Sequence, residues 1–452
     1  SPPTVEESPL FQTYIRGAIL LALLWGGVWG VINLLRIAHA SSFTALNLVS
    51  AQGHAHIQIF GWVGLFIMGV AFHVVPRFMN TVLPHPRAAA GAFWLMAAGV
   101  VLRVLGQVFF SRIPLAGGVL IASGAMELAA IVLFAGVIVQ TVRKGGGKIE
   151  TYLWFLSAGL LSFVVAGVIG LIGTVEMARW ATPFFPFSWL GVLRHLQLYG
   201  FITCFILGVS LRAFPFLLGL RSPWEGMAKW AFVVYGGGVI LQIVALSLDR
   251  SLLAFLAALL ELSGGALFVY ALRIFEPPEI VFPEAHVDRG IFWFVRAAWI
   301  WFLISLGMLV MIRLEAWRAL SPWGHALIGA HPFWDATTHA MALGFITMMI
   351  LGVGFRVIPI FSGRHALTGW GVKLSFLLLC SGVVLRVFVQ PFVSVAPTPR
   401  IFALMGASGL LAYGAMAIFG VVIWRAMSNA PSLEAQEGIP DRITPKTSMR
   451  TI

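Results

Sequence analysis

The sequence predicts an all-α integral membrane protein in which twelve transmembrane helices form three pseudo-threefold arcs of four helices. Of the 452 residues, 60% are hydrophobic and 10% are charged, whereas soluble chains carry roughly 25% charged residues. The mean hydropathy is +0.94, and the apolar residues form runs long enough to cross about 30 Å of hydrocarbon. A five-position motif also recurs three times. This composition excludes a soluble enzyme, a nucleic-acid-binding domain and a disulfide scaffold.

The apolar runs predict twelve spans, at about 14–37, 53–78, 88–111, 114–142, 151–175, 193–219, 224–247, 251–275, 291–313, 336–361, 368–390 and 401–426. Helices are required because lipid cannot satisfy an open main chain, and no barrel-type alternation occurs in the sequence. We expect one transmembrane domain over 1–428, with repeats at about 11–149, 150–289 and 290–428. We expect residues 429–452 to form a polar cytoplasmic tail.

The distribution of basic residues predicts the orientation. With the N-terminus in the cytoplasm, the inner segments carry sixteen lysines and arginines and the outer connections eight, as the positive-inside rule requires. We therefore expect a multi-pass protein of the inner membrane of a prokaryote, in contact with lipid and with both termini cytoplasmic. The polar, acidic start of the sequence does not have the pattern of a signal peptide.

The repeated motif is a histidine, glycines 5 and 13 residues later, a basic residue 17 later and a proline 20 later. It starts at His56, His195 and His339. The starts are 139 and 144 residues apart, which is four spans in each case. Because four is even, the repeats share one orientation and imply a pseudo-threefold axis along the membrane normal, with spans two, six and ten in the centre.

These three histidines and His54 lie near one level in the outer part of the membrane. A polar ring at that depth is costly unless it is paired or functional. A lone membrane histidine is more often a helix–helix hydrogen bonder than a ligand, but three at equivalent positions favour ligation. Neutral imidazole is a common axial ligand of haem iron, and two imidazoles give a low-spin electron-transfer centre.

The tenth span resembles the tenth helix of subunit I of the haem–copper oxidases. The resemblance rests on the series His339-x4-Gly-x7-Gly-x3-Arg-x2-Pro-Ile-Phe-Ser-Gly363. In that family the second histidine of a His-x-His pair holds a low-spin haem and the first holds a high-spin haem. Here the second is His339, whereas Thr337 occupies the first position.

The sixth span also resembles its counterpart in that family, where a copper-ligating histidine precedes a tyrosine by four residues, as His195 precedes Tyr199. The seventh span, 224–247, contains no histidine, although the family places two copper ligands there. The copper and high-spin haem ligand sets are both incomplete, so copper is not expected.

The His54-Ala-His56 sequence and the start of span ten are similar to the NnrS-like group, whose members are twelve-span haem proteins associated with nitric oxide metabolism. This resemblance implies one haem b, with a second haem as an open alternative. It implies electron transfer or a nitric-oxide-linked haem function.

Symmetry indicates which histidines share an iron. Residues two apart on a helix point about 200° apart, so each central helix can face two neighbouring sites. If His339 faces span two, the residue that faces back occupies the position equivalent to Thr337, which is His54. The predicted axial pair is therefore His54 with His339. By the same reasoning His195 and His56 face the other two sites, where each is a single ligand for a second haem or a hydrogen bonder.

Buried carboxylates of haem propionates require arginine. Arg103 and Arg386 occupy equivalent positions about 22 Å along their spans, near the histidine level, and are either propionate partners or snorkelling side chains. Glu127 and Glu261 are either proton relays or helix-packing groups. His331 and Asp335 are either members of this polar network or loop residues. We expect Cys204 and Cys380 to be buried small hydrophobes rather than redox or metal-binding groups.

Three functions therefore stay open: a haem protein for electron transfer or nitric oxide, a divergent nitric oxide or oxygen reductase with an altered site, and a cofactor-free transporter. The first two imply a redox partner or cytochrome c-type subunits, because the sequence contains no Cys-x-x-Cys-His motif for a c-type haem. The sequence makes no prediction of oligomeric state.

Overall fold

The computed structural model describes residues 9–112, 114–146, 149–279, 290–318, 321–363, 367 and 369–428. Within these ranges all regular structure is helical and no strand occurs. Twelve helices there are long and apolar enough to cross a membrane, which confirms the predicted fold class. The predicted tail, 429–452, lies outside the described residues.

The helical elements follow the predicted order. The first four spans contain α1 (Pro9–Leu21), η1 (Ala22–Gly27), α2 (Val28–Ala40), η2 (Phe43–Ala45), α3 (Leu48–His56), η3 (Ile57–Gly64), α4 (Leu65–Phe78), α5 (Pro86–Val108) and α6 (Ala116–Gly145). The next four contain α7 (Thr151–Arg179), α8 (Phe187–His195), η4 (Leu196–Ile202), α9 (Thr203–Leu218), α10 (Glu225–Ser247) and α11 (Ser251–Leu272). The last four contain α12 (Gly290–Trp317), α13 (Pro322–Ile328), α14 (His331–His339), η5 (Ala340–Thr347), α15 (Met348–Phe361), α16 (Trp370–Val384), η6 (Leu385–Val389), η7 (Gln390–Ser394) and α17 (Pro399–Ser428).

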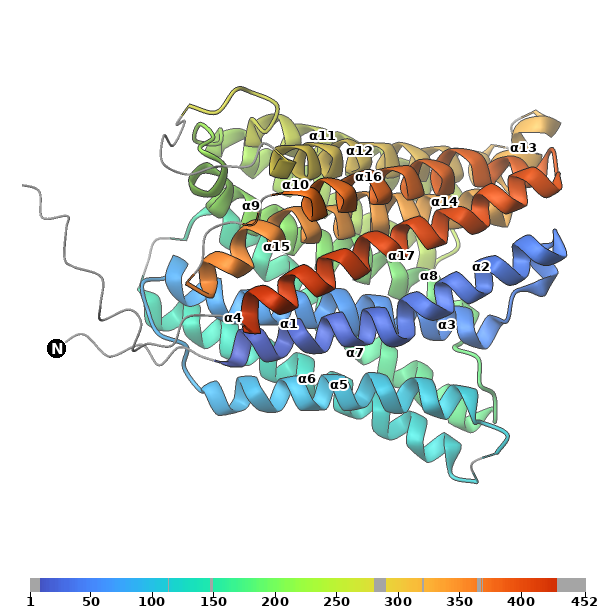
Figure 1. The fold of residues 1–452 in the computed structure, drawn as a ribbon, viewed down its shortest axis with the longest axis horizontal. Coiled ribbons are helices and arrows are strands. Elements are labelled where there is room, and N and C mark those ends of the chain that lie inside the picture. The colour runs from blue at the N-terminus through green and yellow to red at the C-terminus, as the bar shows by residue number, and fades with distance from the viewer. Residues whose placement is uncertain are drawn as a thin grey trace, which may run out of the picture.

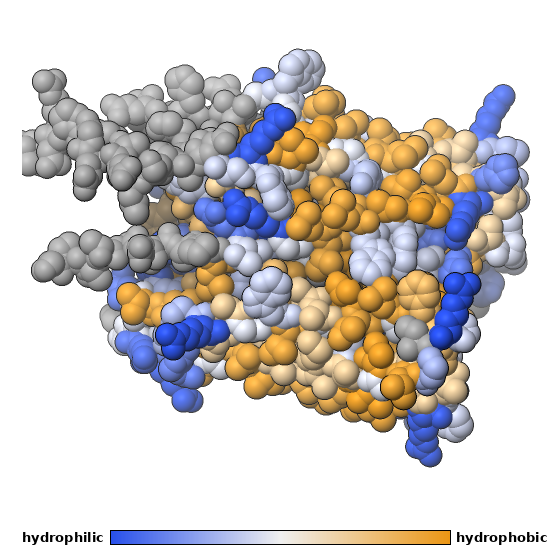
Figure 2. All heavy atoms as spheres, turned by 60° about the horizontal axis from the view of Figure 1, so that its bottom comes forward, coloured by the Kyte–Doolittle hydropathy of each residue, from blue (hydrophilic) through white to orange (hydrophobic). Residues whose placement is uncertain are grey.

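The spans run side by side along the long axis of the molecule (Figure 1). The start of α1 and the end of α17 lie at one end, with α4, α9 and α15, whereas α3, α8 and α14 lie toward the other end. We call the latter the histidine end. On the face seen in Figure 2, apolar side chains cover the middle of the bundle and hydrophilic side chains gather toward both ends. The chain is therefore a multi-pass membrane protein.

Equivalent glycines make equivalent contacts in the three predicted repeats. An added Cβ at Gly99 would lie 2.8 Å from Cγ of Glu127, and one at Gly238 would lie 2.9 Å from Cγ of Glu261. At Gly382 the corresponding neighbour is the main chain of Ala412, 3.1 Å away. These contacts support the three-repeat interpretation and place an alanine where the first two repeats carry a glutamate.

The three central spans begin five or six residues earlier than their hydropathy predicted. They start at Leu48, Phe187 and His331, each eight residues before a motif histidine. Polar residues in the first turns of the second and tenth spans lower the local hydropathy, so the apolar runs in the sequence begin later than the helices do. The histidines consequently lie about 12 Å inside their helices, rather than in the first turn.

A π-helical segment directly follows each motif histidine: η3 after His56, η4 after His195 and η5 after His339. Two more such segments, η1 and η6, occur in the first and eleventh spans of the described chain. A π-turn inserts an extra residue and interrupts the i to i+4 pattern, and such turns are frequent at functional sites. The Thr203 and Thr347 hydroxyls donate to carbonyls five residues earlier, at 2.7 and 2.8 Å, and so satisfy groups within the interrupted pattern.

Candidate haem site

His54, the first predicted ligand, projects from α3 toward the first span. Its Nδ1 donates to the carbonyl of Gly26, 2.7 Å away, in the π-helical segment η1. An added Cβ at Gly30 would lie 2.6 Å from Cε1 of His54, so only a glycine allows the ring to approach α2 this closely. Because Nδ1 carries the proton, Nε2 holds the lone pair that a metal requires.

His339, the second predicted ligand, has the same arrangement in the tenth span. Its Nδ1 donates to the carbonyl of Asp335 over 2.8 Å, and the carboxylate of Asp335 lies 3.4 Å from the same nitrogen. Across the part of the chain that the structure covers, no protein atom bonds to Nε2 of either His54 or His339. Both imidazoles are therefore in the tautomer that ligates iron through Nε2.

The two histidines belong to one polar cluster. His54 interacts electrostatically with His339, Arg386 and Asp335, so side chains from the second, tenth and eleventh spans share one region. Nη2 of Arg386 lies 2.8 Å from the Asp335 carboxylate, and Gln390 donates to the same carboxylate at 2.7 Å. Arg386 and Gln390 therefore hold the carboxylate of Asp335 in place beside Nδ1 of His339.

Arg386 retains hydrogen-bonding capacity after it has paired with Asp335. It is 8% exposed, and its Nε and Nη1 are buried without a partner. A buried guanidinium with unused donors is costly, and a carboxylate such as a haem propionate would satisfy it. The residues present therefore fit a haem: two open imidazole nitrogens and an arginine with donors to spare.

The other two motif histidines contact glutamates. Nε2 of His56 lies 2.8 Å from Oε1 of Glu127 in a hydrogen bond. Nε2 of His195 lies 3.0 Å from Oε1 of Glu261, but the alignment is not that of a hydrogen bond, and both carboxylate oxygens are buried without one. The ring of Tyr199 stacks on His195, with centroids 4.5 Å apart and planes inclined by 13°. In both pairs the nitrogen that is open in His339 faces a carboxylate.

The two predicted propionate arginines lie in different surroundings. Arg103 interacts electrostatically with Glu127 and lies over the ring of Phe185 at 5.3 Å, in the region of His56. Arg386 lies with His54 and His339. Both are buried, at 4% and 8% exposed, and therefore do not extend to the surface.

Other polar residues of these spans, and the two cysteines, contact groups that hold the bundle together. His73, the basic residue of the motif in the first repeat, packs against Phe11 and Phe361, with ring centroids 4.9 and 3.9 Å away. Thr337 donates to the carbonyl of Phe333 at 2.9 Å, and His331 is exposed at the edge of α14. Cys204 and Cys380 are free thiols. In the ranges searched, no three histidine, cysteine or acidic side chains gather as a set for a bare metal ion.

The family model described as NnrS protein matches residues 9–430. The chain belongs to the NnrS family. No curated protein matches this NnrS family member by sequence. Among solved structures it resembles a chain of a heme-copper terminal oxidase dimer determined by cryo-electron microscopy, with a TM-score of 0.64 at 11% identity. The match covers 94% of this chain and 85% of the other, and at that identity it shows the fold alone.

The sequence of this NnrS family member did not predict the π-helical segments. Four of the five lie in the first, second, tenth and eleventh spans, which supply Gly26, His54, His339 and Arg386. The available signal was the glycine five residues after each motif histidine, which falls inside the segment in all three repeats.

Proposed function

We propose that this protein holds one haem b between His54 and His339, within the subunit I fold, and serves electron transfer or a nitric-oxide-linked haem function. One observation carries the proposal. Both imidazoles donate Nδ1–H to a main-chain carbonyl and leave Nε2 open, and they come from the two spans that symmetry paired. The family match and the oxidase-like fold support a haem protein.

The protein groups have separate roles in this proposal. The Gly26 and Asp335 carbonyls hold the two rings in the ligating tautomer, and Gly30 leaves room for the first ring. Asp335 also increases the basicity of His339, as outer carboxylates do for ligating histidines. Arg386 and Gln390 hold Asp335, and the unused donors of Arg386 bind a propionate. The bound haem supplies one-electron exchange.

We further propose the inner membrane of a prokaryote as the location, with both termini in the cytoplasm. The excess of basic residues in the inner segments supports this orientation. The histidine end then faces outward, where a redox partner or a cytochrome c-type subunit would exchange electrons.

An absorption and electron paramagnetic resonance spectrum of the purified full-length chain tests the proposal. We expect low-spin bis-histidine haem, and we expect both His54→Ala and His339→Ala to abolish that signal. His85→Ala is a matched control, because His85 bonds to Gln140 and should leave the spectrum unchanged. A colourless protein, or a low-spin signal that survives His339→Ala, would contradict the assignment.

A divergent nitric oxide or oxygen reductase is the second candidate. The observation in its favour is the buried group of His195, Tyr199 and Glu261, where His195 is 3% exposed and Glu261 is fully buried. A high-spin component that binds carbon monoxide and disappears in His195→Ala would favour this function. A purely low-spin spectrum would favour the first proposal.

A further inference from the structure

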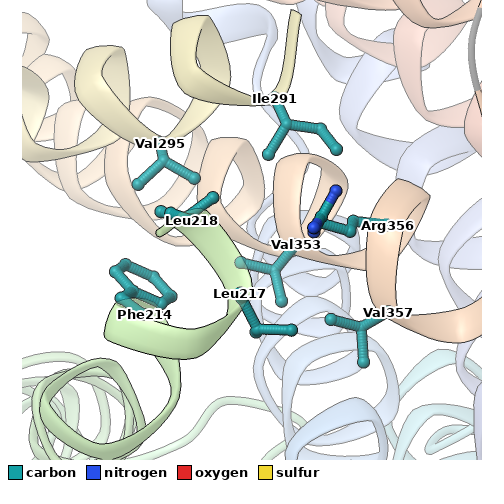
Figure 3. Close-up of a pocket in the computed structure, with 8 residues that line it drawn as sticks. All are labelled: Phe214, Leu217, Leu218, Ile291, Val295, Val353, Arg356 and Val357. Atoms are coloured by element: carbon teal, nitrogen blue, oxygen red, sulfur yellow. The ribbon is translucent and has the colours of Figure 1, made fainter. Parts of the chain in front are cut away.

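A crevice lies at the end of the bundle opposite the histidine end, where α9, α12 and α15 meet (Figure 3). Its walls are apolar: Phe214 and Leu218 come from α9, and Ile291 and Val295 from α12. From α15, Val353 and Val357 lie beside Arg356, whose guanidinium is among these side chains in Figure 3. The crevice therefore combines one cation with an otherwise apolar lining.

Arg356 is buried, and no residue that the structure describes pairs with it. It is 8% exposed, and its Nε is buried without a hydrogen bond. Within the ranges that the structure describes, no hydrogen bond or ion pair to its guanidinium occurs. An uncompensated charge inside a membrane domain is expensive, so an anionic partner at this guanidinium would be stabilising.

The equivalent positions in the other repeats are satisfied. Arg212 lies 3.6 Å from Glu150 and 5.8 Å above the ring of Tyr152, with a side chain that is 36% exposed. His73 packs against two phenylalanine rings. The lack of a partner is specific to Arg356 among these three positions and does not come from the repeated motif.

The crevice lies near the ends of three spans, the level at which we expect lipid headgroups. Arg356 precedes the end of α15 by five residues, or about 8 Å. At the same end, α9 finishes at Leu218 and α12 starts at Gly290. The enclosed space of the crevice is about 10 Å³, which is no more than a single water molecule requires. A lipid would therefore lie against the mouth of the crevice, with its phosphate at the guanidinium and its acyl chain along the apolar side chains.

We propose that Arg356 and its apolar walls form a binding site for an anionic phospholipid, with the phosphate on the guanidinium and an acyl chain against the α9 and α12 side chains. A guanidinium pairs with a phosphate through charge-assisted hydrogen bonds. The apolar walls favour a phosphate that is attached to a hydrocarbon chain over a soluble anion. Only the hydrocarbon chain gains free energy by burying apolar surface against these walls.

Lipid binding to the purified full-length chain tests this site. We expect native mass spectrometry to show bound phosphatidylglycerol, with about tenfold weaker binding in Arg356→Gln and partial retention in Arg356→Lys. Val353→Phe fills the crevice without a change in charge and should also weaken binding. Arg212→Gln is the matched control and should bind as the parent does. Melting curves without lipid verify that each variant is folded.

Four results would overturn the site. Equal phosphatidylglycerol binding in the parent, Arg356→Gln and Val353→Phe would show that neither the charge of Arg356 nor the crevice contributes to lipid binding. Equal loss in Arg212→Gln would show a general charge effect. Phosphatidylcholine that binds as tightly would refute anionic selectivity, and inorganic phosphate that competes as well as the lipid would identify a free-anion site. None of these measurements depends on haem.

Discussion

His339 and His195 occupy equivalent positions in their helices, but their Nε2 atoms have different neighbours. Each histidine closes a nine-residue helix, α14 or α8, and precedes a π-helical segment. Nε2 of His195 faces Glu261 at 3.0 Å, and the equivalent His56 bonds to Glu127 at 2.8 Å. His339 has its Nδ1 on a carbonyl and an open Nε2.

The difference coincides with a change at one position in the fourth helix of each repeat. Glu127 and Glu261 occupy it in α6 and α11, whereas the glycine contacts place Ala412 there in α17. In the first two repeats a carboxylate lies within 3.0 Å of Nε2, whereas in the third an alanine occupies the equivalent position and no described residue bonds to Nε2 of His339. We infer that this one side chain decides whether the histidine can serve as a ligand, and the following substitutions test that inference.

The largest expected effect comes from Ala412→Glu. The new carboxylate would meet Nε2 of His339 as Glu127 meets His56, and would compete with iron for that nitrogen. We expect haem occupancy to fall by about tenfold or more, measured as haem per protein after purification. Ala412→Met adds similar length without charge and should retain more haem. Full occupancy in Ala412→Glu would refute the comparison.

Arg386→Gln should weaken haem retention by about tenfold, because it removes the buried donors assigned to a propionate. Loss of a positive charge beside the iron also stabilises the ferric state, so the midpoint potential should fall. Haem transfer to apomyoglobin and a redox titration measure the two effects. Arg103→Gln, in the His56 region, should change neither. The reverse pattern would assign the propionate to Arg103.

Glu127→Ala should lower stability and leave the low-spin spectrum intact. It removes the hydrogen-bond partner of the His56 Nε2, which costs about 1–3 kcal/mol, seen as a lower melting temperature in detergent. Glu261→Ala should lower stability less, since the Glu261 carboxylate lies 3.0 Å from Nε2 of His195 without a hydrogen bond. Loss of the low-spin bands in Glu261→Ala would instead place the haem near His195.

The smallest expected effect is that of Thr347→Val. The hydroxyl of Thr347 satisfies the Ala342 carbonyl in the π-helical segment after His339, and its loss should cost about 0.5–1.5 kcal/mol. Thr203→Val makes the same change after His195. If both variants lose the same stability but only Thr347→Val shows a small shift in the haem spectrum, the π-turn after His339 contacts or positions the haem. Identical spectra would limit both threonines to a structural role.

The sequence predicted the membrane fold, the twelve spans and the repeat that relates them. These features are local or periodic: the length of an apolar run decides whether it crosses lipid, and a motif at a fixed spacing needs no coordinates. The sequence also paired His54 with His339 as a hypothesis, since opposite faces of a helix follow from the helical repeat alone. That assignment stays a prediction until the haem spectrum is measured.

Only the tertiary structure decided what each polar side chain meets. His56 and Glu127 are 71 residues apart in the chain, and Asp335 and Gln390 are 55 apart. It also separated Arg103 from Arg386, although their sequences are equivalent, and it introduced the π-turns that no hydropathy pattern encodes. The physical reason is that burial in lipid sets which segments are helices, whereas the packing of distant helices sets which donors and acceptors come within 3 Å.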